Sequence, residues 1–273
     1  MHTRKDRYIR RIPLSTETAY MNMATDEYLF YSKEADVTPI LRFYMWNPSS
    51  ATIGRNQSMD AEVDIDYSNS NGINYTRRIT GGGAVLHSSL NELTYMFVSP
   101  KKILNQAYSR LIKEGLYHSD DIPRYYVPIL QSLIVGLSEL GLTLDINKMH
   151  CPALMVSGKK ISGNSQAMRS EVVLQHGTLL LKIDPEEMYS VLKVPESKTK
   201  KNIVLSVKAK VGALHEFLSS DDVSIETLCT HLTNGFSKVF MSEIKDEQLS
   251  ETELNEILKL AERYRSGEWI FRK

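Results

Sequence analysis

The segment RRITGGGAVLH, residues 77–87, places two arginines directly before three consecutive glycines and ends on a histidine. Glycine has no Cβ, so the backbone of Gly81, Gly82 and Gly83 can reach positive φ values and approach a ligand closely. Arginine adds a planar, permanently charged group that pairs with carboxylates and phosphates. The combination predicts an anion-binding loop, although three glycines by themselves more often mark a solvated hairpin.

A second glycine-flanked segment, GKKISGN at residues 158–164, carries lysines where the first carries arginines, and QHG follows at residues 175–177. Residues 157–158 form the predicted turn of a hairpin whose second strand contains Lys160. Side chains alternate between the two faces of a strand, so we expect Lys159 to point away from Lys160 as a solvated charge. Two such loops can enclose one anionic ligand.

The composition is that of an ordinary globular protein without net charge. Of 273 residues, 42% are hydrophobic and 24% are charged, with 33 lysines plus arginines against 33 aspartates plus glutamates. This length allows one sizeable core. The even charge balance gives little support for nucleic-acid binding, which needs a basic surface that releases counterions. No segment approaches the roughly 20 apolar residues of a membrane helix, so we expect no membrane span.

The cysteines and the N-terminal residues indicate a cellular compartment. Cys151 and Cys229 are too few for a disulfide framework and fit a reducing environment. Residues Met1 to Arg11 are basic, but no apolar segment follows them, as a signal peptide requires. We therefore interpret them as an exposed tail leading into a strand, and expect a cytoplasmic protein.

Hydrophobic periodicity predicts helices and strands in mixed order, without an internal repeat. The predicted helices are Thr18 to Tyr31, Tyr125 to Leu140, Glu186 to Leu192, Val223 to Phe240 and Glu251 to Arg265. Short β-branched or aromatic runs predict neighbouring strands of one sheet at Leu41 to Trp46, Thr52 to Ile53, Asn74 to Arg78, Ala84 to Leu86 and Leu93 to Val98. Further strands are predicted at Ala153 to Val156, Lys160 to Ser162 and Val172 to Leu181.

The segment Glu196 to Lys210 is rich in lysine, with Lys198, Lys200, Lys201, Lys208 and Lys210. We interpret its first half, up to Asn202, as a loop that becomes ordered on a ligand. A solvated surface loop is the general expectation for a run of charges. The position of this segment after the two anion-binding loops favours a function.

Together, the patterns RRxxGGGAVxH, GKKISGNxQ and QHGTLL resemble the lipoate-protein ligase A family, part of the wider group of biotin and lipoate attachment enzymes. The resemblance covers nearly the whole chain, from Asn22–Glu27 to Tyr264–Trp269. It implies an α/β (α+β) fold with a mixed, largely antiparallel sheet flanked by helices. It also implies that residues 1–273 are a single catalytic domain without the small C-terminal accessory domain, as in the archaeal two-protein arrangement.

The resemblance implies a two-step chemistry: ATP-dependent activation of lipoate as lipoyl-AMP, then transfer of the lipoyl group to a lysine of an acceptor protein. That acceptor is a lipoyl domain of a 2-oxoacid dehydrogenase E2 or a glycine-cleavage H protein, and adenylation needs a separate small accessory ligase subunit. Fixed positive charges must hold the two reacting anions together. We expect Lys160 to bridge the lipoate carboxylate and the α-phosphate. ATP implies Mg²⁺, but the sequence contains no cluster of metal ligands.

The same motifs supply the remaining predicted site residues. Contacts to substrate or nucleotide are expected from Arg78, Gly81, Gly82, Gly83, Ala84, His87, Ser162, Gly163, Asn164 and His176. Val85 and Tyr44 are expected to line the acyl tunnel. A lone histidine is as often structural as functional, so both roles stay open for His87 and His176. The lysine-rich segment after Pro195 resembles the adenylate-binding region of the family.

The chain departs from the family pattern at two places. Residues 88–91 read Ser-Ser-Leu-Asn where the family usually has Asp-x-Gly-Asn, and Pro152-Ala153 stands where Asn-Asp often precedes the lysine strand. These losses suggest one alternative, a catalytically silent scaffold that binds lipoylated domains. Lys160 and the arginine loop argue against it, because a scaffold needs no paired anion site.

A further alternative is a transferase of the same fold, which takes octanoyl from acyl carrier protein through a cysteine thioester and needs no ATP. Its thiol would be Cys151, which lies near Lys160 in sequence. A reactive thiol requires an electropositive setting, and an inert buried cysteine is the more common case. His150 is adjacent but would face the other way in a strand. The lysine-rich segment favours the ligase.

Overall fold

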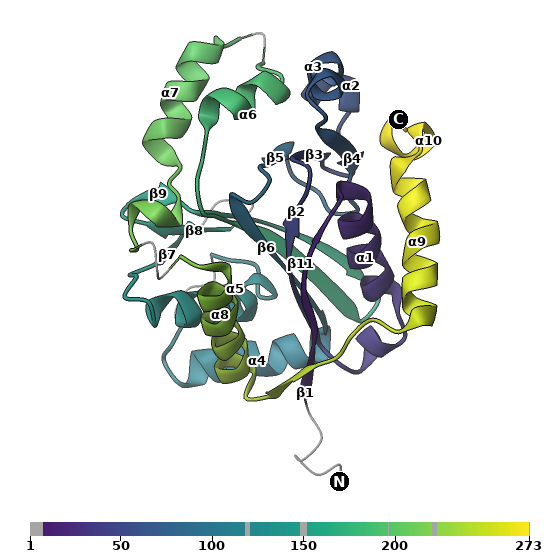
Figure 1. Cartoon of the computed structure of the whole chain (residues 1–273). Coiled ribbons are helices and arrows are strands. Elements are labelled where there is room, and N and C mark those ends of the chain that lie inside the picture. Colours follow the sequence, from purple (N-terminus) through teal and green to yellow (C-terminus); the bar gives the residue numbers. More distant parts are fainter. Residues whose placement is uncertain (1–7, 118–120, 148–151, 196, 220–222, 273) are drawn as a thin grey trace.

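The computed structural model describes residues 8–117, 121–147, 152–195, 197–219 and 223–272. A six-stranded sheet runs through the middle of the molecule with helices on both faces (Figure 1). Its strands, in spatial order, are β10 (Ser162–Arg169), β11 (Val172–Leu180), β6 (Glu92–Pro100), β2 (Ile40–Trp46), β1 (Tyr8–Glu17) and β12 (Glu243–Asp246). The first four strands are antiparallel neighbours, and β1 and β12 join them in parallel. The predicted mixed, largely antiparallel sheet is confirmed.

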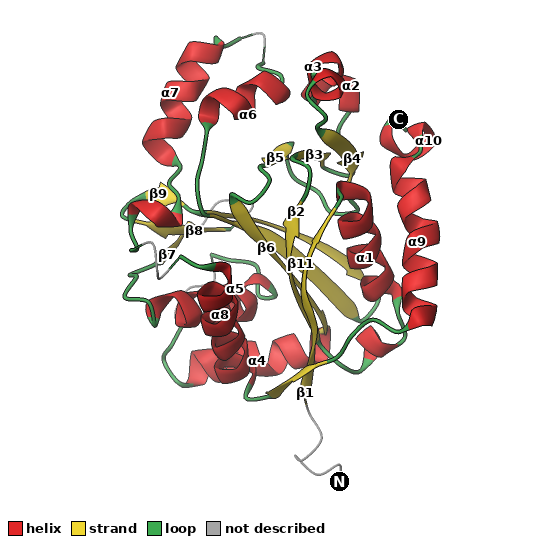
Figure 2. Ribbon diagram, in the orientation of Figure 1, coloured by secondary structure: helices red, strands yellow, loops and turns green. Residues whose placement is uncertain are grey.

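Two small sheets flank the large one, as Figure 2 shows. One contains β4 (Asn74–Arg77), β3 (Ser50–Ile53) and β5 (Val85–His87), and the other β7 (Asp145–Asn147), β8 (Ala153–Val156) and β9 (Lys159–Lys160). The expectation that the strands from Leu41 to Val98 form one sheet was wrong. Both edges of β3 are occupied by β4 and β5, so this strand cannot also pair with β2 or β6.

The central strands β2 and β6 of the large sheet are buried on both faces, and alternation along them divides their side chains between two cores. In β2, Leu41, Phe43 and Met45 join one core, whereas Ile40, Tyr44 and Trp46 join the other. Side chains of period two explain this division. The strand β2, which is apolar apart from Arg42, is therefore a central strand.

Helices cover the two faces. The first core lies against α4 (Lys101–Lys113), α5 (Tyr126–Ser138) and α8 (Ile225–Phe240), and the second against α1 (Ala19–Tyr31) and α9 (Glu251–Arg265). Oxygen-bearing side chains begin several of them: Thr18 accepts a hydrogen bond from the amide of Met21, and Ser250 forms a capping box with Glu253. The predicted helices at these positions are confirmed, while α4 was not predicted.

Short helices complete the fold around the small sheet of β3, β4 and β5. They are α2 (Met59–Glu62), α3 (Ile65–Ser70), α6 (Pro185–Val191) and α10 (Gly267–Ile270). A third apolar cluster, which includes Ile53, Met59, Val191 and Ile270, joins them. None of the helices in the described ranges is both long and apolar enough to cross a membrane.

Two local predictions differ from the structure. Tyr8–Arg11 was expected in an exposed tail but opens β1, where pairing with β2 and β12 buries Ile9 completely. Lys200 to Asn202 was expected in a loop but begins helix α7 (Lys200–Lys210), capped by the Thr199 side chain on the amide of Asn202. Residues 200–210 contain neither glycine nor proline, so the helix is not interrupted. Met1–Arg7 and Glu196 lie outside the described residues.

Candidate active site

A cavity of about 150 Å³ lies where the small sheet of β3, β4 and β5 meets the strands β2, β6, β10 and β11 of the large one. It collects residues from both glycine-flanked segments, which are far apart in sequence. The lining residues are Met23, Tyr44, Trp46, Thr52, Arg78, Gly82, Gly83, Val85, His87, Thr94, Lys160, Gly163, Asn164, Ser165, His176, Gly177 and Thr178. Of the predicted site residues, Gly81, Ala84 and Ser162 are not among them.

Part of the cavity wall is apolar and part is polar. Met23, Tyr44, Trp46 and Val85 supply hydrocarbon and aromatic surface, and Tyr44 and Val85 are the residues predicted to line an acyl tunnel. The indole of Trp46 stacks on the imidazole of His87, with ring centroids 3.9 Å apart and planes within 14°. Such a wall accommodates an aliphatic chain whose head group faces the polar side.

Gly82 and Gly83 of the glycine loop, residues 81–83, line one wall of the cavity, and the loop conformation requires glycine at Gly82 and at the neighbouring Gly54. Gly82 has φ of 92°, a region that other residues rarely adopt. The loop also approaches Gly54, where an added Cβ would lie 2.1 Å from the carbonyl oxygen of Gly82. The Ser165 hydroxyl donates to the carbonyl of Gly81 at 2.9 Å, which ties the loop to β10.

The Arg78 guanidinium is buried, and all three of its nitrogens donate hydrogen bonds to protein oxygens. Nε donates to Thr80 Oγ1 at 3.2 Å, and one terminal nitrogen donates to the carbonyl and hydroxyl oxygens of Thr52, both at 3.2 Å. The other donates to the carbonyls of Gly81 and Gly83, both at 2.7 Å. Sequence reasoning expected Arg78 to bind the ligand anion. In this conformation it braces the glycine loop from within.

Arg77, one residue earlier, points to the opposite side of β4 and holds different segments together. It donates to the carbonyls of Arg55 and Gln57 and to those of Ile270 and Arg272, at 2.5–3.0 Å. Burial, with a smaller contribution from the charge of Arg272, lowers the pKa of Arg77. The adjacent arginines thus have separate structural partners.

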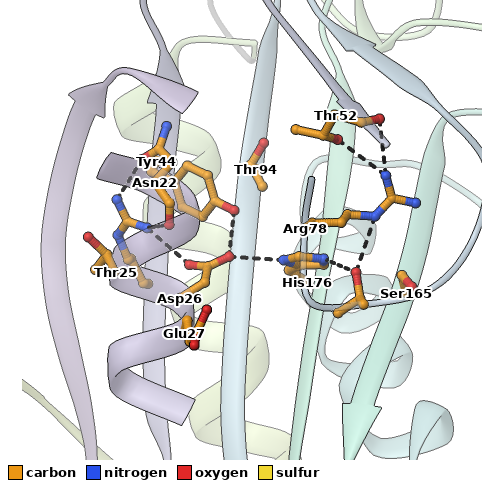
Figure 3. A network of polar contacts seen from close by, with 12 residues as sticks. Asn22, Thr25, Asp26, Glu27, Tyr44, Thr52, Arg78, Thr94, Ser165 and His176 are labelled. Carbon is orange, nitrogen blue, oxygen red and sulfur yellow. Dashed lines mark hydrogen bonds and ion pairs between the residues drawn. The ribbon is translucent and has the colours of Figure 1, made fainter. Parts of the chain in front are cut away.

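His176 and His87 each connect a threonine to a buried carboxylate. Nδ1 of His176 lies 2.9 Å from Asp26 Oδ2, and its Nε2 lies 2.7 Å from Thr80 Oγ1. Nδ1 of His87 lies 2.7 Å from Glu92 Oε1, and its Nε2 lies 2.9 Å from Thr52 Oγ1. Figure 3 shows Asp26, His176, Arg78 and Thr52 in one connected set of contacts.

Further partners fix the two carboxylates. Asp26 accepts hydrogen bonds from the Arg42 guanidinium at 3.0 Å and from the Tyr44 hydroxyl at 2.8 Å. Burial, reinforced by the Asp26 charge, raises the pKa of Tyr44, so this hydroxyl remains a donor. Glu92 accepts from the Thr94 hydroxyl at 2.9 Å, which in turn accepts from the indole of Trp46.

Sequence reasoning missed Asp26 and Glu92 as members of the site. Asn22 and Asp26 lie four residues apart, so both polar side chains face the same side of helix α1, and both are buried. Glu92 and Thr94 alternate in the same way along β6. Buried polar residues on one face of an apolar element are the signal that would have indicated them.

Lys160 and Lys159 point in opposite directions on β9, as the strand alternation predicts. Lys160 lines the cavity, and a Cβ added to Gly163 would lie 3.5 Å from its Nζ, so the ammonium lies over the first residues of β10. Lys159 pairs with Glu216 at the surface, with Nζ 2.6 Å from Oε2. The backbone of Lys160 accepts a hydrogen bond from the amide of Gly212, which connects β9 to the residues after α7.

Asn164, predicted to contact nucleotide, is engaged by protein groups. Its Oδ1 accepts from the Tyr95 hydroxyl at 2.6 Å and from Ser162 at 3.3 Å, and its Nδ2 donates to the carbonyl of Pro152 at 2.8 Å. An added Cβ at Gly177 would lie 2.2 Å from that Oδ1, so a glycine is needed here. Asn164 therefore fastens the segment that begins at Pro152 to the wall of the cavity.

Of the two cysteines, Cys229 lies in the described part of the chain. Cys229 lies on α8, outside the cavity lining, and burial raises the pKa of its thiol to about 12. Cys151 and His150, the residues considered for a thioester mechanism, lie outside the described residues. Within the described ranges, no group of three or more His, Cys, Asp or Glu side chains is arranged to hold a metal ion.

Comparison with protein families identifies the class of catalytic domain to which the chain belongs. The model named Lipoyl protein ligase A/B catalytic domain matches residues 18–237, and the chain belongs to this family. Among relatives, the protein named Octanoyltransferase LipM of Staphylococcus aureus is 32% identical over 273 residues, covering 96% of this chain and 98% of its own. That of Carboxydothermus hydrogenoformans is 34% identical over 268 residues, covering 92% and 94%.

Solved structures agree on the fold. The bi-partite lipoate protein ligase of Thermoplasma acidophilum superimposes with a TM-score of 0.81 at 29% identity, covering 97% of both chains. A lipoate-protein ligase A bound with ATP gives 0.77 at 29% identity, covering 96% of this chain and 98% of that one. The resemblance to the lipoate-protein ligase A family is thereby confirmed.

Proposed function

We propose that this protein is an acyltransferase that moves an octanoyl group from acyl carrier protein to a lysine of an acceptor protein, a lipoyl domain or an H protein. The observation that carries the proposal is the similarity over almost the full chain to proteins named octanoyltransferase. The cavity supports it, because an apolar wall is joined to a lysine at its polar end. The sequence patterns favoured the ATP-dependent ligase and left the transferase as an alternative, and the proposal reverses that preference.

The proposed nucleophile is Cys151. Its thiolate attacks the thioester carbonyl, the carrier thiol leaves and takes up a proton, and an octanoyl thioester forms on the enzyme. The amine of the acceptor lysine then attacks that thioester. A C–N bond forms, the C–S bond breaks, and the amine proton is released as the thiolate of Cys151 is restored. Because the octanoyl thioester of the carrier protein is already activated, the reaction consumes no nucleotide.

Three observations in the described residues support this assignment. Cys229 is unsuited, since its raised thiol pKa keeps it protonated at neutral pH and it lies outside the cavity lining. Cys151 directly precedes Pro152, whose carbonyl is bound by the cavity residue Asn164. Lys160 supplies positive charge at the cavity, which stabilises a thiolate and the oxyanion formed when the carbonyl is attacked.

The test compares two reactions of the purified protein with a lipoyl-domain acceptor. One mixture contains octanoyl carrier protein without nucleotide, and the other contains lipoate, ATP and Mg²⁺. We expect acyl-acceptor, detected by mass spectrometry, in the first mixture. Product only in the second, with or without a small accessory protein, would establish the ligase instead, and binding of lipoylated domains without either reaction would establish the scaffold.

Matched cysteine variants test the nucleophile. Cys151→Ser should abolish transfer and the covalent octanoyl adduct, whereas Cys229→Ser should retain both. Thiol alkylation at pH 8 gives a second readout, because the thiol of Cys229, with a pKa of about 12, stays neutral there and reacts slowly. Full transfer by a folded Cys151→Ser variant would refute the thioester mechanism.

A further inference from the structure

The Arg78 guanidinium is contacted by two parallel chains of hydrogen bonds. The Asp26 relay consists of Asp26, His176 and Thr80, and the Glu92 relay consists of Glu92, His87 and Thr52. Both threonine hydroxyls accept from Arg78, one from Nε and the other from a terminal nitrogen. Sequence separations of up to 150 residues within these contacts show that tertiary structure brings them together.

The direction of each hydrogen bond follows from donor chemistry. An ionised carboxylate only accepts, so Nδ1 of His176 and of His87 carries a proton toward Asp26 and Glu92. In a neutral imidazole the other nitrogen, Nε2, is then an acceptor. Each threonine must donate its single hydroxyl proton to that Nε2. The lone pairs of the hydroxyl are left for Arg78.

Charge balance is consistent with two neutral imidazoles. Arg42 and Arg78 carry the positive charges of the network, and Asp26 and Glu92 carry the negative ones, all four being buried. Ionised groups away from water require such compensation. The relays therefore connect the buried carboxylates to Arg78 without adding charge.

Arg78 transmits this arrangement to the glycine loop. The terminal nitrogen that contacts neither threonine donates to the carbonyls of Gly81 and Gly83. These carbonyls flank Gly82, which lines the cavity with a left-handed backbone. The orientation of the guanidinium thus determines the shape of one cavity wall.

We propose that Asp26 and Glu92 are positioning residues for acyl transfer, acting through His176 and His87 on Thr80 and Thr52, and through these on Arg78 and the glycine loop. The inference rests on the proposed function, because it assigns the loop to the acyl-binding wall. Neither carboxylate lines the cavity, so each acts at one remove. The two relays converge on the Arg78 guanidinium, and each holds it in the orientation in which it also contacts the threonine of the other relay.

Removing the threonine hydroxyls tests the relays at the point where they meet Arg78. Thr52→Val and Thr80→Val keep the side-chain shape, so each deletes one hydroxyl. We expect kcat/KM for octanoyl carrier protein to fall about 5–10-fold in each, since a lost buried hydrogen bond leaves its partner unsatisfied. The double variant should lose more than the product of the two single losses.

Thr76→Val is the matched control. Thr76 is fully buried in the neighbouring strand β4, and its hydroxyl donates to the carbonyl of Tyr264 without contacting Arg78. Its loss of kcat/KM should stay within about twofold, and it should show no coupling to Arg78→Lys. In the Arg78→Lys background, the effects of Thr52→Val and Thr80→Val should largely disappear. Equal losses in all three threonine variants, or additive losses unaffected by Arg78→Lys, would refute the proposal.

Histidine ¹⁵N NMR adds a readout independent of acyl chemistry. Both His87 and His176 should be neutral and protonated on Nδ1, and Thr80→Val should shift mainly the Nε2 signal of His176. An Nε2-protonated or doubly protonated ring in either residue would contradict the relay. If the wild type ligates lipoate with ATP and transfers no octanoyl group, the proposed function fails, and the same threonine variants are then measured in that reaction. Coupled losses there would support the positioning role.

Discussion

The two segments that carry positive charge to the cavity use it differently. In the segment of residues 77–87, the guanidiniums of Arg77 and Arg78 are buried, and their hydrogen bonds satisfy backbone and threonine oxygens. In the segment around β9 and α7, Lys160 faces the cavity and the helix lysines are exposed, with Val204 the one buried side chain of α7. The buried arginines thus stabilise the structure of the site, whereas the exposed lysines are accessible to a ligand.

The largest expected effect tests whether Lys160 acts on the substrate. Lys160→Ala should lower the rate of acyl transfer by ~10²–10³, the usual loss when a preorganised charge is removed from a reaction centre. Thermal unfolding should change little, since the side chain is exposed. Single-turnover kinetics measure the chemical step directly. A decrease of less than tenfold in the rate of acyl transfer would contradict a direct action of Lys160 on the substrate.

The next effect concerns the braced segment. Gly54→Ala places a methyl group 2.1 Å from the carbonyl oxygen of Gly82, so the backbone must shift, and we expect a loss of about 1–3 kcal/mol in unfolding free energy. Gly83→Ala is the control for stability, because an added Cβ there meets nothing within 4 Å. Urea denaturation compares them. Equal stability of both variants would show that the loop is not tightly held.

A smaller effect is expected on α7. Lys201 and Lys210 are exposed, and neither makes an ion pair with a described acidic residue. Reversing both charges, Lys201→Glu with Lys210→Glu, should raise KM for an acidic donor protein several-fold at low salt, and high salt should remove the difference. The control pair is Lys33→Glu with Lys113→Glu, on distant exposed positions. An equal change in both pairs would remove α7 as a specific contact.

The smallest effect is expected at Lys159. Its ion pair with Glu216 is partly exposed, and such pairs contribute about 0–1 kcal/mol to stability. Lys159→Ala should therefore keep transfer activity within about twofold of the wild type, measured beside Lys160→Ala. Comparable losses in the two variants would contradict the assignment of the two lysines to opposite faces.

Local patterns predicted those parts of the fold and site that depend on neighbours in sequence. The amphipathic pattern of Glu251 to Arg265 predicted the helix α9, and strand alternation separated Lys159 from Lys160. Both rules act over a few residues, so one sequence suffices. The glycine loop was recognised for the same reason.

Features that depend on distant partners could not be predicted. Arg78 donates to Thr52, 26 residues away, and its other threonine partner, Thr80, leads through His176 to Asp26, a contact that spans 150 residues. The role of Arg78 therefore depends on distant pairings. Hydropathy also cannot show that β3 has both edges occupied, because a central strand of a small sheet resembles one of a large sheet. The helix α7 was missed because a run of lysines was interpreted by charge, whereas its propensity is helical.

The hydrogen bonds from Arg77 to the residues after α9 can form only late in protein synthesis. The acceptors in Trp269, Ile270 and Arg272 leave the ribosome 192 to 195 residues after Arg77 itself. Contacts this distant form late when a chain folds as it is translated. Until then, Arg77 has its acceptors in Arg55 and Gln57 but lacks those in residues 269–272. The cavity wall that follows Arg77 in the chain therefore reaches its final support only after residues 269–272 have been synthesised.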